Sequence, residues 1–296
     1  FGALFLVYLL TASLTFIGTD EWFLFDTAES FARRGSVMRN ITADLDWPGH
    51  TYVEPVLPLL SVPLILLADN VRGIGVSHTA LLLNAVVTAA TGMVLFLYGR
   101  RLDYGRGVAI ALALLFGMTT IAWPYSKNYF REPASGLALL LAAYGLLRWR
   151  QGLRKSDGWP HYWLLLSIFC VAVSILAKES SAIGVPFLML ILLVGRGNMP
   201  RSRREIWQLG LMIVVLVGLA VAGLYAYTNV LGAAIFRFHP IDRVLAAYSN
   251  LRIAGEGILG FLISPGKGVF WHSPVIVFAL AAPWLANLSL IHISEP

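Results

Sequence analysis

An uncharged apolar run meets a cluster of carboxylates in FGALFLVYLLTASLTFIGTDEWFLFDTAESFARRGS, residues 1–36. No charged side chain occurs before Gly18, and four carboxylates then follow, Asp20, Glu21, Asp26 and Glu29. A carboxylate at such a boundary must stay in water or find a partner, because its desolvation costs several kcal/mol. The stretch therefore predicts an apolar segment that ends at a polar boundary, where charges either mark the end of the segment or carry chemistry.

The composition predicts an all-α polytopic membrane protein. Of the 296 residues, 58% are hydrophobic and only 13% are charged, with a mean hydropathy of +0.73, whereas soluble domains carry about 25% charged residues. A spanning helix needs about 20 mostly apolar residues. The runs that approach this are 1–18, 77–98, 107–123, 134–148, 161–177, 182–195, 207–228 and 273–287. We expect residues 1–287 to form one transmembrane domain with one span for each run.

A further apolar run, 55–68, contains three prolines. Proline inside a helix removes a hydrogen bond and kinks the helix, so we expect this run to be interfacial or re-entrant. Three basic loops, 100–106, 148–155 and 196–204, then share one side of the membrane, and positive loops stay in the cytoplasm. This places the acidic loop 19–76 outside. The net charge of +6 comes largely from these loops, so no nucleic-acid partner is expected.

The residues that follow the acidic pair have the spacing of a surface helix. Phe25, Ala28, Phe31 and Ala32 recur at helical intervals with charged residues between them, which predicts a short amphipathic helix over 26–34. Such a helix would hold the acidic pair over the membrane. A carboxylate there could take a proton from an acceptor hydroxyl within reach.

Two further loops on the same side combine acidic and basic residues. Arg131 and Glu132 open an apolar run at YFREPAS (residues 129–135), although Glu followed by Pro is also an ordinary helix start. Lys178 and Glu179 follow the apolar run 161–177. The lysine either extends to the membrane interface or meets a phosphate, whose developing charge needs a fixed cation.

The stretch GFLISPGKGVFWHSPV, residues 260–275, contains a glycine-rich turn with Lys267, followed by His272. The spacing is not that of a nucleotide-binding loop, because Gly268 follows the lysine where Ser or Thr is needed. Backbone amides of such a turn can still bind phosphate oxygens. His272 lies beside Trp271, and a lone histidine there is more often a packed interfacial side chain than a ligand.

Together these features resemble the GT-C class of membrane glycosyltransferases, in particular the group of the protein O-mannosyltransferases and the aminoarabinose-to-lipid-A transferases. The resemblance rests on the acidic pair after the first span, the surface helix, and the proline-rich run that starts at Glu54. It implies a GT-C-like helix bundle with short surface helices in the first external loop. By the resemblance Asp20 would be the catalytic base, with Glu21 as its neighbour, and Glu132 would position the acceptor or a metal. Lys178, with Arg131 or Lys267, would bind the donor phosphate. Glu179 and His272 would have accessory roles.

The resemblance implies transfer of a sugar from a polyprenyl-phosphate donor to a hydroxyl of a lipid, glycan or protein, by an inverting displacement. The enzyme would lie in a bacterial plasma membrane with its site on the outer face, and a divalent metal cation would be a possible cofactor. A transporter or lipid flippase is the alternative, and a membrane scaffold without activity is a third reading. The last residues, 288–296, resemble the translation of a sequencing adapter, so we expect a non-native tail on a C-terminally truncated chain.

Overall fold

The structure, a computed structural model, describes residues 1–37, 49, 51–155, 161–185, 187–188, 210–211, 214, 218, 221–223, 225–230, 251–265, 268–274 and 276. All regular elements among these residues are helices, which confirms the all-α class for the described part of the chain. The expected spans 182–195, 207–228 and 273–287 lie partly outside the described residues, and the expected tail 288–296 lies wholly outside them.

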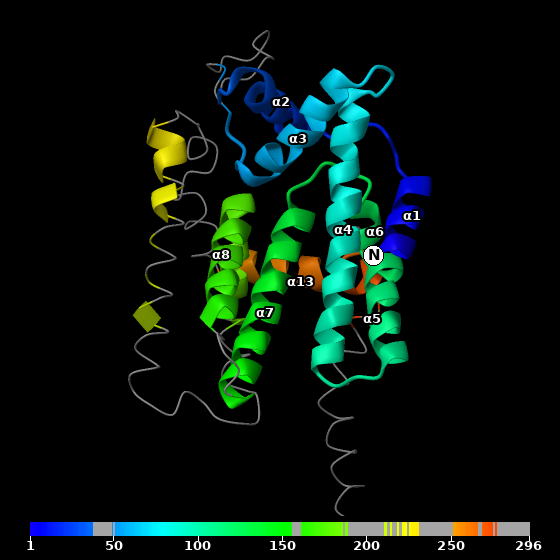
Figure 1. The fold of residues 1–296 in the computed structure, drawn as a ribbon, viewed down its shortest axis with the longest axis vertical. Helices are drawn as coiled ribbons and strands as arrows, with labels where there is room; N and C mark the ends of the chain where they lie inside the picture. The colour runs from blue at the N-terminus through cyan, green and yellow to red at the C-terminus, as the bar shows by residue number, and fades with distance from the viewer. Residues whose placement is uncertain are drawn as a thin grey trace, which may run out of the picture.

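Four long helices run side by side and form a bundle (Figure 1). They are α4 (Val76–Arg101), α5 (Arg106–Thr119), α7 (Glu132–Lys155) and α8 (His161–Ala177). Each corresponds to an apolar run of the sequence. Among the described helices, α4 is long and apolar enough to cross a membrane, whereas α5 and α8 are apolar but shorter. The presence of several spans therefore remains a proposal.

The basic helix ends meet at one end of this bundle. Helix α4 ends at Arg101, and the side-chain amide of Gln151, near the end of α7, donates a hydrogen bond to the Arg101 carbonyl at 2.8 Å. Figure 1 shows the α4–α5 turn and the end of α7 at the same lower end. Two of the three basic loops therefore lie together, and the third, 196–204, is outside the described residues.

Two helices, α2 (Thr19–Arg34) and α3 (Val56–Asn70), pack against each other at the opposite end (Figure 1). Leu24 of α2 and Leu57 of α3 are fully buried in the core between them. Phe25 and Ala28 of the predicted apolar face lie in this core, and Ala32 packs against it. The helix begins earlier and includes the acidic pair, and its polar residues Asp26, Thr27 and Ser30 are buried as well. The proline-rich run is helical, with Pro63 inside α3.

The first apolar run is not one continuous helix. Helix α1 (Gly2–Leu10) ends well before the acidic pair, and Leu14 has a positive φ of 56°. The side chains beyond α1 bond to a distant segment: the Thr11 hydroxyl accepts a hydrogen bond from the Trp123 indole at 3.1 Å, and the Ser13 hydroxyl donates to the Lys127 carbonyl at 2.8 Å. The hydroxyl-bearing residues of the run therefore join it to the segment that precedes α7.

The remaining elements are short, apart from α13. They are α6 (Ala122–Tyr125), η1 (Glu179–Gly184), η2 (Ala226–Val230), α13 (Leu251–Ile263) and α14 (Val269–His272). Helix α6 lies between α5 and α7, and Figure 1 shows α13 crossing behind the bundle.

Candidate functional site

The start of α2 places the two acidic residues in opposite environments. The Glu21 carboxylate is fully buried and accepts three backbone hydrogen bonds, from Ile17 at 2.7 Å, Gly18 at 2.8 Å and Tyr129 at 2.6 Å. The first two close the amino-terminal turn of the helix, where backbone N–H groups otherwise lack partners. Asp20, one residue earlier, is exposed.

These contacts give Glu21 a role in holding the fold. Both of its oxygens already accept hydrogen bonds, and its side chain is shielded from solvent. A carboxylate in this position cannot contact a substrate unless the surrounding backbone moves. The contact with Tyr129 instead joins the first loop to the segment before α7. The two segments are far apart in the sequence, so their contact could not be read from either one alone.

The connection 126–131 is held from several helices. Asn84, fully buried in the middle of α4, donates both amide hydrogens to it, to the carbonyls of Asn128 at 2.7 Å and Phe130 at 2.8 Å. The Tyr129 hydroxyl bonds to Ser61 of α3, and burial raises the pKa of this tyrosine, so it stays a neutral hydrogen-bonding group. Successive residues of the connection are therefore fixed to α2, α3 and α4.

The connection ends in two ion pairs. Arg131 pairs with Glu54, which lies just before α3 and has a side chain only 5% exposed. Glu132, the first residue of α7, pairs with Lys178, which follows α8. The two residues of the predicted Arg131–Glu132 motif thus turn to different partners. Lys178 pairs with Glu132 and not with its neighbour Glu179, which is exposed.

Hydroxyl groups brace the helices that carry the Glu132–Lys178 pair. Ser135 of α7 and Ser174 of α8 are hydrogen-bonded at 2.9 Å, and Ser135 also bonds to Ser181. Tyr125 of α6 lies near the carboxylate: burial, together with the negative charge of Glu132, raises the pKa of its phenol. The pair is therefore set between well-anchored helix ends.

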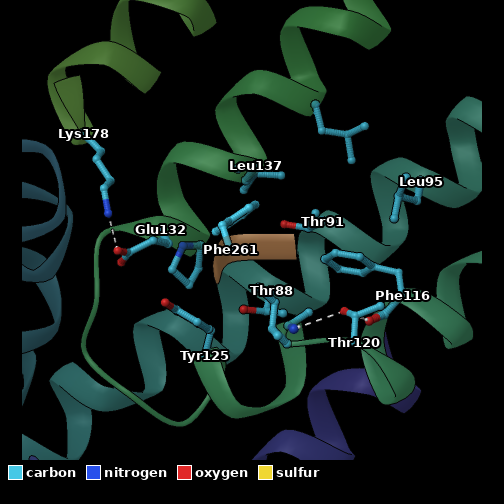
Figure 2. A pocket seen from close by; sticks show the side chains of 15 residues that line it. Thr88, Thr91, Leu95, Phe116, Thr120, Tyr125, Glu132, Leu137, Lys178 and Phe261 are labelled. Atoms are coloured by element: carbon cyan, nitrogen blue, oxygen red, sulfur yellow. Dashed lines mark hydrogen bonds and ion pairs between the residues drawn. The ribbon is translucent and has the colours of Figure 1, made fainter. Parts of the chain in front are cut away.

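A cavity of about 560 Å³ adjoins this ion pair. Its wall comes from α4, α5, α6 and α7, with Phe261 of α13 closing one side, and most of the lining side chains are apolar. Figure 2 shows Lys178 and Glu132 together at one end and Phe116 and Leu95 at the other. Its volume is in the usual range for small-molecule pockets, about 300–1,000 Å³.

His272 has no described contact with the Glu132–Lys178 pair. His272 is exposed at the end of α14. The neighbouring Ser273 is buried, and its hydroxyl accepts a hydrogen bond from the backbone N–H of Ile121 at 3.1 Å, which ties this segment to the start of α6. Lys267 lies outside the described residues.

The divalent metal that the resemblance implies stays a prediction. No group of three His, Cys, Asp or Glu side chains that could hold an ion occurs within the described ranges. The carboxylate oxygens of Glu21 are engaged by backbone amides, and one Glu132 oxygen faces Lys178. Hard cations prefer several oxygen ligands, so neither Glu21 nor Glu132 is by itself a metal site.

Sequence reasoning missed Asn84 and Glu54 and gave Tyr129 no role. Asn84 had a readable signal, because a strong hydrogen-bonding side chain in the middle of an apolar run needs a buried partner. Glu54 was seen only as the start of a proline-rich run. Its pairing with Arg131, 77 residues later in the chain by their numbers, depends on the way α3 folds back.

Comparisons of the chain with models of protein families, with curated proteins and with solved structures give no match.

Proposed function

We propose that this chain is a membrane glycosyltransferase that moves a sugar from a polyprenyl-phosphate donor to an acceptor hydroxyl. One observation carries the proposal: the connection 126–131 joins the start of α2, which bears the exposed Asp20, to the Glu132–Lys178 pair beside an apolar cavity. A base, a cation and an apolar cavity are what transfer from a lipid phosphate requires.

In this mechanism Asp20 removes the proton from the acceptor hydroxyl, and the hydroxyl oxygen attacks the anomeric carbon. The bond from that carbon to the phosphate oxygen breaks with inversion, and the phosphate leaves on its lipid. Lys178 stabilises the negative charge of the leaving phosphate. Glu132 orients the acceptor once the donor phosphate has taken over Lys178. Glu21 is assigned the role of positioning α2, and Arg131, engaged with Glu54, the role of fixing the start of α7.

The surface of the bundle supports a location in a membrane. On α5, Val108, Ile110 and Leu112 are 51%, 42% and 43% exposed, and large exposed apolar surfaces mark contact with lipid or with a partner. The basic ends of α4 and α7 lie at the end away from α2. The positive-inside rule supports assigning that end to the cytoplasm, and we propose that Asp20 and Lys178 lie on the outer face of a multi-pass bacterial plasma-membrane protein.

The test is transfer of a labelled sugar from polyprenyl phosphate by the full chain in lipid vesicles. Asp20→Asn should abolish transfer while the thermal unfolding midpoint stays unchanged. Asp103→Asn is the matched control, because Asp103 lies in the turn between α4 and α5 at the other end of the bundle. Absence of transfer by the wild-type chain would count against the activity and leave the transporter or flippase alternative. Normal transfer by Asp20→Asn would remove Asp20 from its role.

A further inference from the structure

The cavity beside the ion pair contains two polar oxygens without a partner. Thr88 is 2% exposed, and its hydroxyl has no hydrogen-bond partner among the described residues. The second carboxylate oxygen of Glu132 is also buried without a partner in the described part of the chain. Native structures normally satisfy such groups, so these two atoms point to a ligand.

The other threonines of the cavity show that Thr88 is exceptional. Thr91 donates to the Val87 carbonyl at 2.9 Å, and Thr120 donates to the Phe116 carbonyl at 2.6 Å. Both hydroxyls are therefore satisfied by the carbonyl four residues earlier in the chain, a bond that threonine often makes in helices. Thr88, on the same helix as Thr91, has no such bond. Figure 2 shows it among the side chains that line the cavity, with Glu132 and Lys178 beyond it.

The charges at the cavity end match a ligand that carries both signs. Lys178 offers a cation and Glu132 offers a carboxylate oxygen that nothing in the described ranges occupies. From this end the wall becomes apolar, with Leu137, Leu95 and Phe116 along it (Figure 2). A complementary ligand therefore has an anionic group, an ammonium group and a hydrocarbon chain.

We propose that this cavity binds a zwitterionic phospholipid with a primary ammonium headgroup, of the phosphatidylethanolamine class. The lipid phosphate lies at Lys178, the ammonium donates to the free oxygen of Glu132, and the Thr88 hydroxyl donates to an oxygen of the glycerol ester region. One acyl chain enters the apolar part of the cavity. This binding does not depend on glycosyl transfer. If both proposals hold, phospholipid and donor compete for Lys178.

Other lipids fit this set of groups less well. A lipid with only negative charge satisfies Lys178 but is repelled by the adjacent Glu132 carboxylate. A sterol brings an apolar body and a hydroxyl but leaves the ion pair without a charged partner. A free phosphate or a soluble headgroup leaves the apolar wall uncovered. The combination of groups thus selects both the headgroup and the chain.

The experiment compares two lipids that differ only in the headgroup. The full chain in detergent is equilibrated with equal amounts of phosphatidylethanolamine and phosphatidylglycerol that carry the same acyl chains, and the retained lipid is counted by native mass spectrometry. The wild-type chain should retain phosphatidylethanolamine in preference. Glu132→Gln should reduce this preference by about tenfold, the loss expected for one charge-assisted hydrogen bond. Equal retention of both lipids by the wild-type chain overturns the headgroup assignment.

Two glycine variants test the place of binding. A side chain added at Gly136, in the cavity wall, would meet nothing within 4 Å at its Cβ, and the same holds for Gly107 at the start of α5. Gly136→Leu should fill the cavity and lower phosphatidylethanolamine retention, whereas Gly107→Leu should leave it unchanged. Unchanged retention in Gly136→Leu overturns the cavity as the site. Equal competition by soluble glycerophosphoethanolamine overturns the role of the acyl chain.

Thr88→Val separates ligand binding from folding. This change keeps the shape of the side chain and removes the hydroxyl that lacks a partner, so the lipid-free protein should unfold at a higher temperature. Phosphatidylethanolamine retention should nevertheless fall. A purely structural threonine would not give gains in stability together with losses in binding. Unchanged retention overturns the contact assigned to Thr88, and this variant stays informative if Gly136→Leu does not fold.

Discussion

Glu21 and Glu132 lie at the starts of two helices, and both adjoin the connection 126–131, yet their carboxylates are used differently. Glu21 is fully buried and accepts three backbone hydrogen bonds. Glu132 has a side chain 35% exposed, one oxygen paired with Lys178 and the other without a partner among the described residues. The first carboxylate stabilises the local backbone, and the second is available for a ligand. An acidic residue at a helix start is therefore not by itself a sign of chemistry.

The largest expected effect is the loss of stability in Glu21→Gln. Glutamine has one acceptor oxygen, and its amide group would face backbone N–H donors, so at least one of the three hydrogen bonds is lost and a buried donor is left without a partner. The free energy of unfolding should fall by about 3 kcal/mol. Denaturant unfolding in detergent, followed by tryptophan fluorescence, measures it.

Glu132→Gln is the matched control for that change. Its ion pair with Lys178 is partly exposed, so the free energy of unfolding should change by less than about 1 kcal/mol. Equal losses in the two variants would contradict the division of roles between the two glutamates.

A smaller loss is expected for Asn84→Ala, which removes the hydrogen bonds to the carbonyls of Asn128 and Phe130. The free energy of unfolding should fall by about 2 kcal/mol, and amide hydrogen exchange should become faster in 126–131. The comparison variant is Asn70→Ala, because Asn70 is exposed at the end of α3 and donates only to Leu66. Exchange rates in 126–131 that match the wild type would show that Asn84 does not hold the connection.

The smallest effect concerns an exposed carboxylate, Asp69, whose pKa is lowered by its hydrogen bond with Arg33. Because the pKa of Asp69 is lower in the folded state, its bond with Arg33 stabilises the fold fully above the ordinary carboxyl pKa of 3.8, which applies to the unfolded chain. This stabilisation is lost as the pH falls through the pKa of the folded state. At neutral pH, Asp69→Asn should therefore have a slightly lower unfolding midpoint temperature than the wild type, and this difference should vanish in acid. Unfolding midpoints from about pH 7 to about pH 2.5 test this. A difference that persists in acid would rule out the linkage.

The helices of the bundle could be predicted from the sequence because their apolar runs are long. The runs 77–98 and 161–177 agree closely with α4 and α8. The run 1–18 misled the prediction because hydropathy does not register the hydroxyl contacts of Thr11 and Ser13 with the segment before α7. Hydropathy indicates that a segment avoids water, but it does not indicate whether lipid or another part of the protein covers that segment.

The candidate site could be predicted only in part. Glu132 and Lys178 were both assigned to one site, and the structure does bring them into contact. Their pairing could not be foreseen, because sequence neighbours such as Glu179 offered a nearer partner. Lys178 has an extended backbone, with φ of −159° and ψ of 115°, and Glu179 begins η1, so these two neighbours in sequence have different partners in space. The fully satisfied state of Glu21 likewise depends on Tyr129, 108 residues away.

The anchoring of 126–131 to α2, α3 and α4 has a consequence for insertions and deletions. Loops usually accept a change in length, but here the carbonyls of Asn128 and Phe130 are held by Asn84, so a residue added after Phe130 would displace the start of α7. Glu132 would then be displaced from Lys178, its partner, with every side chain still present. The turn between α4 and α5 is held by fewer groups: its described side-chain bonds are those of Arg100 to the Tyr104 carbonyl and of Gln151 to the Arg101 carbonyl. It is therefore the better place to splice a tag or a reporter.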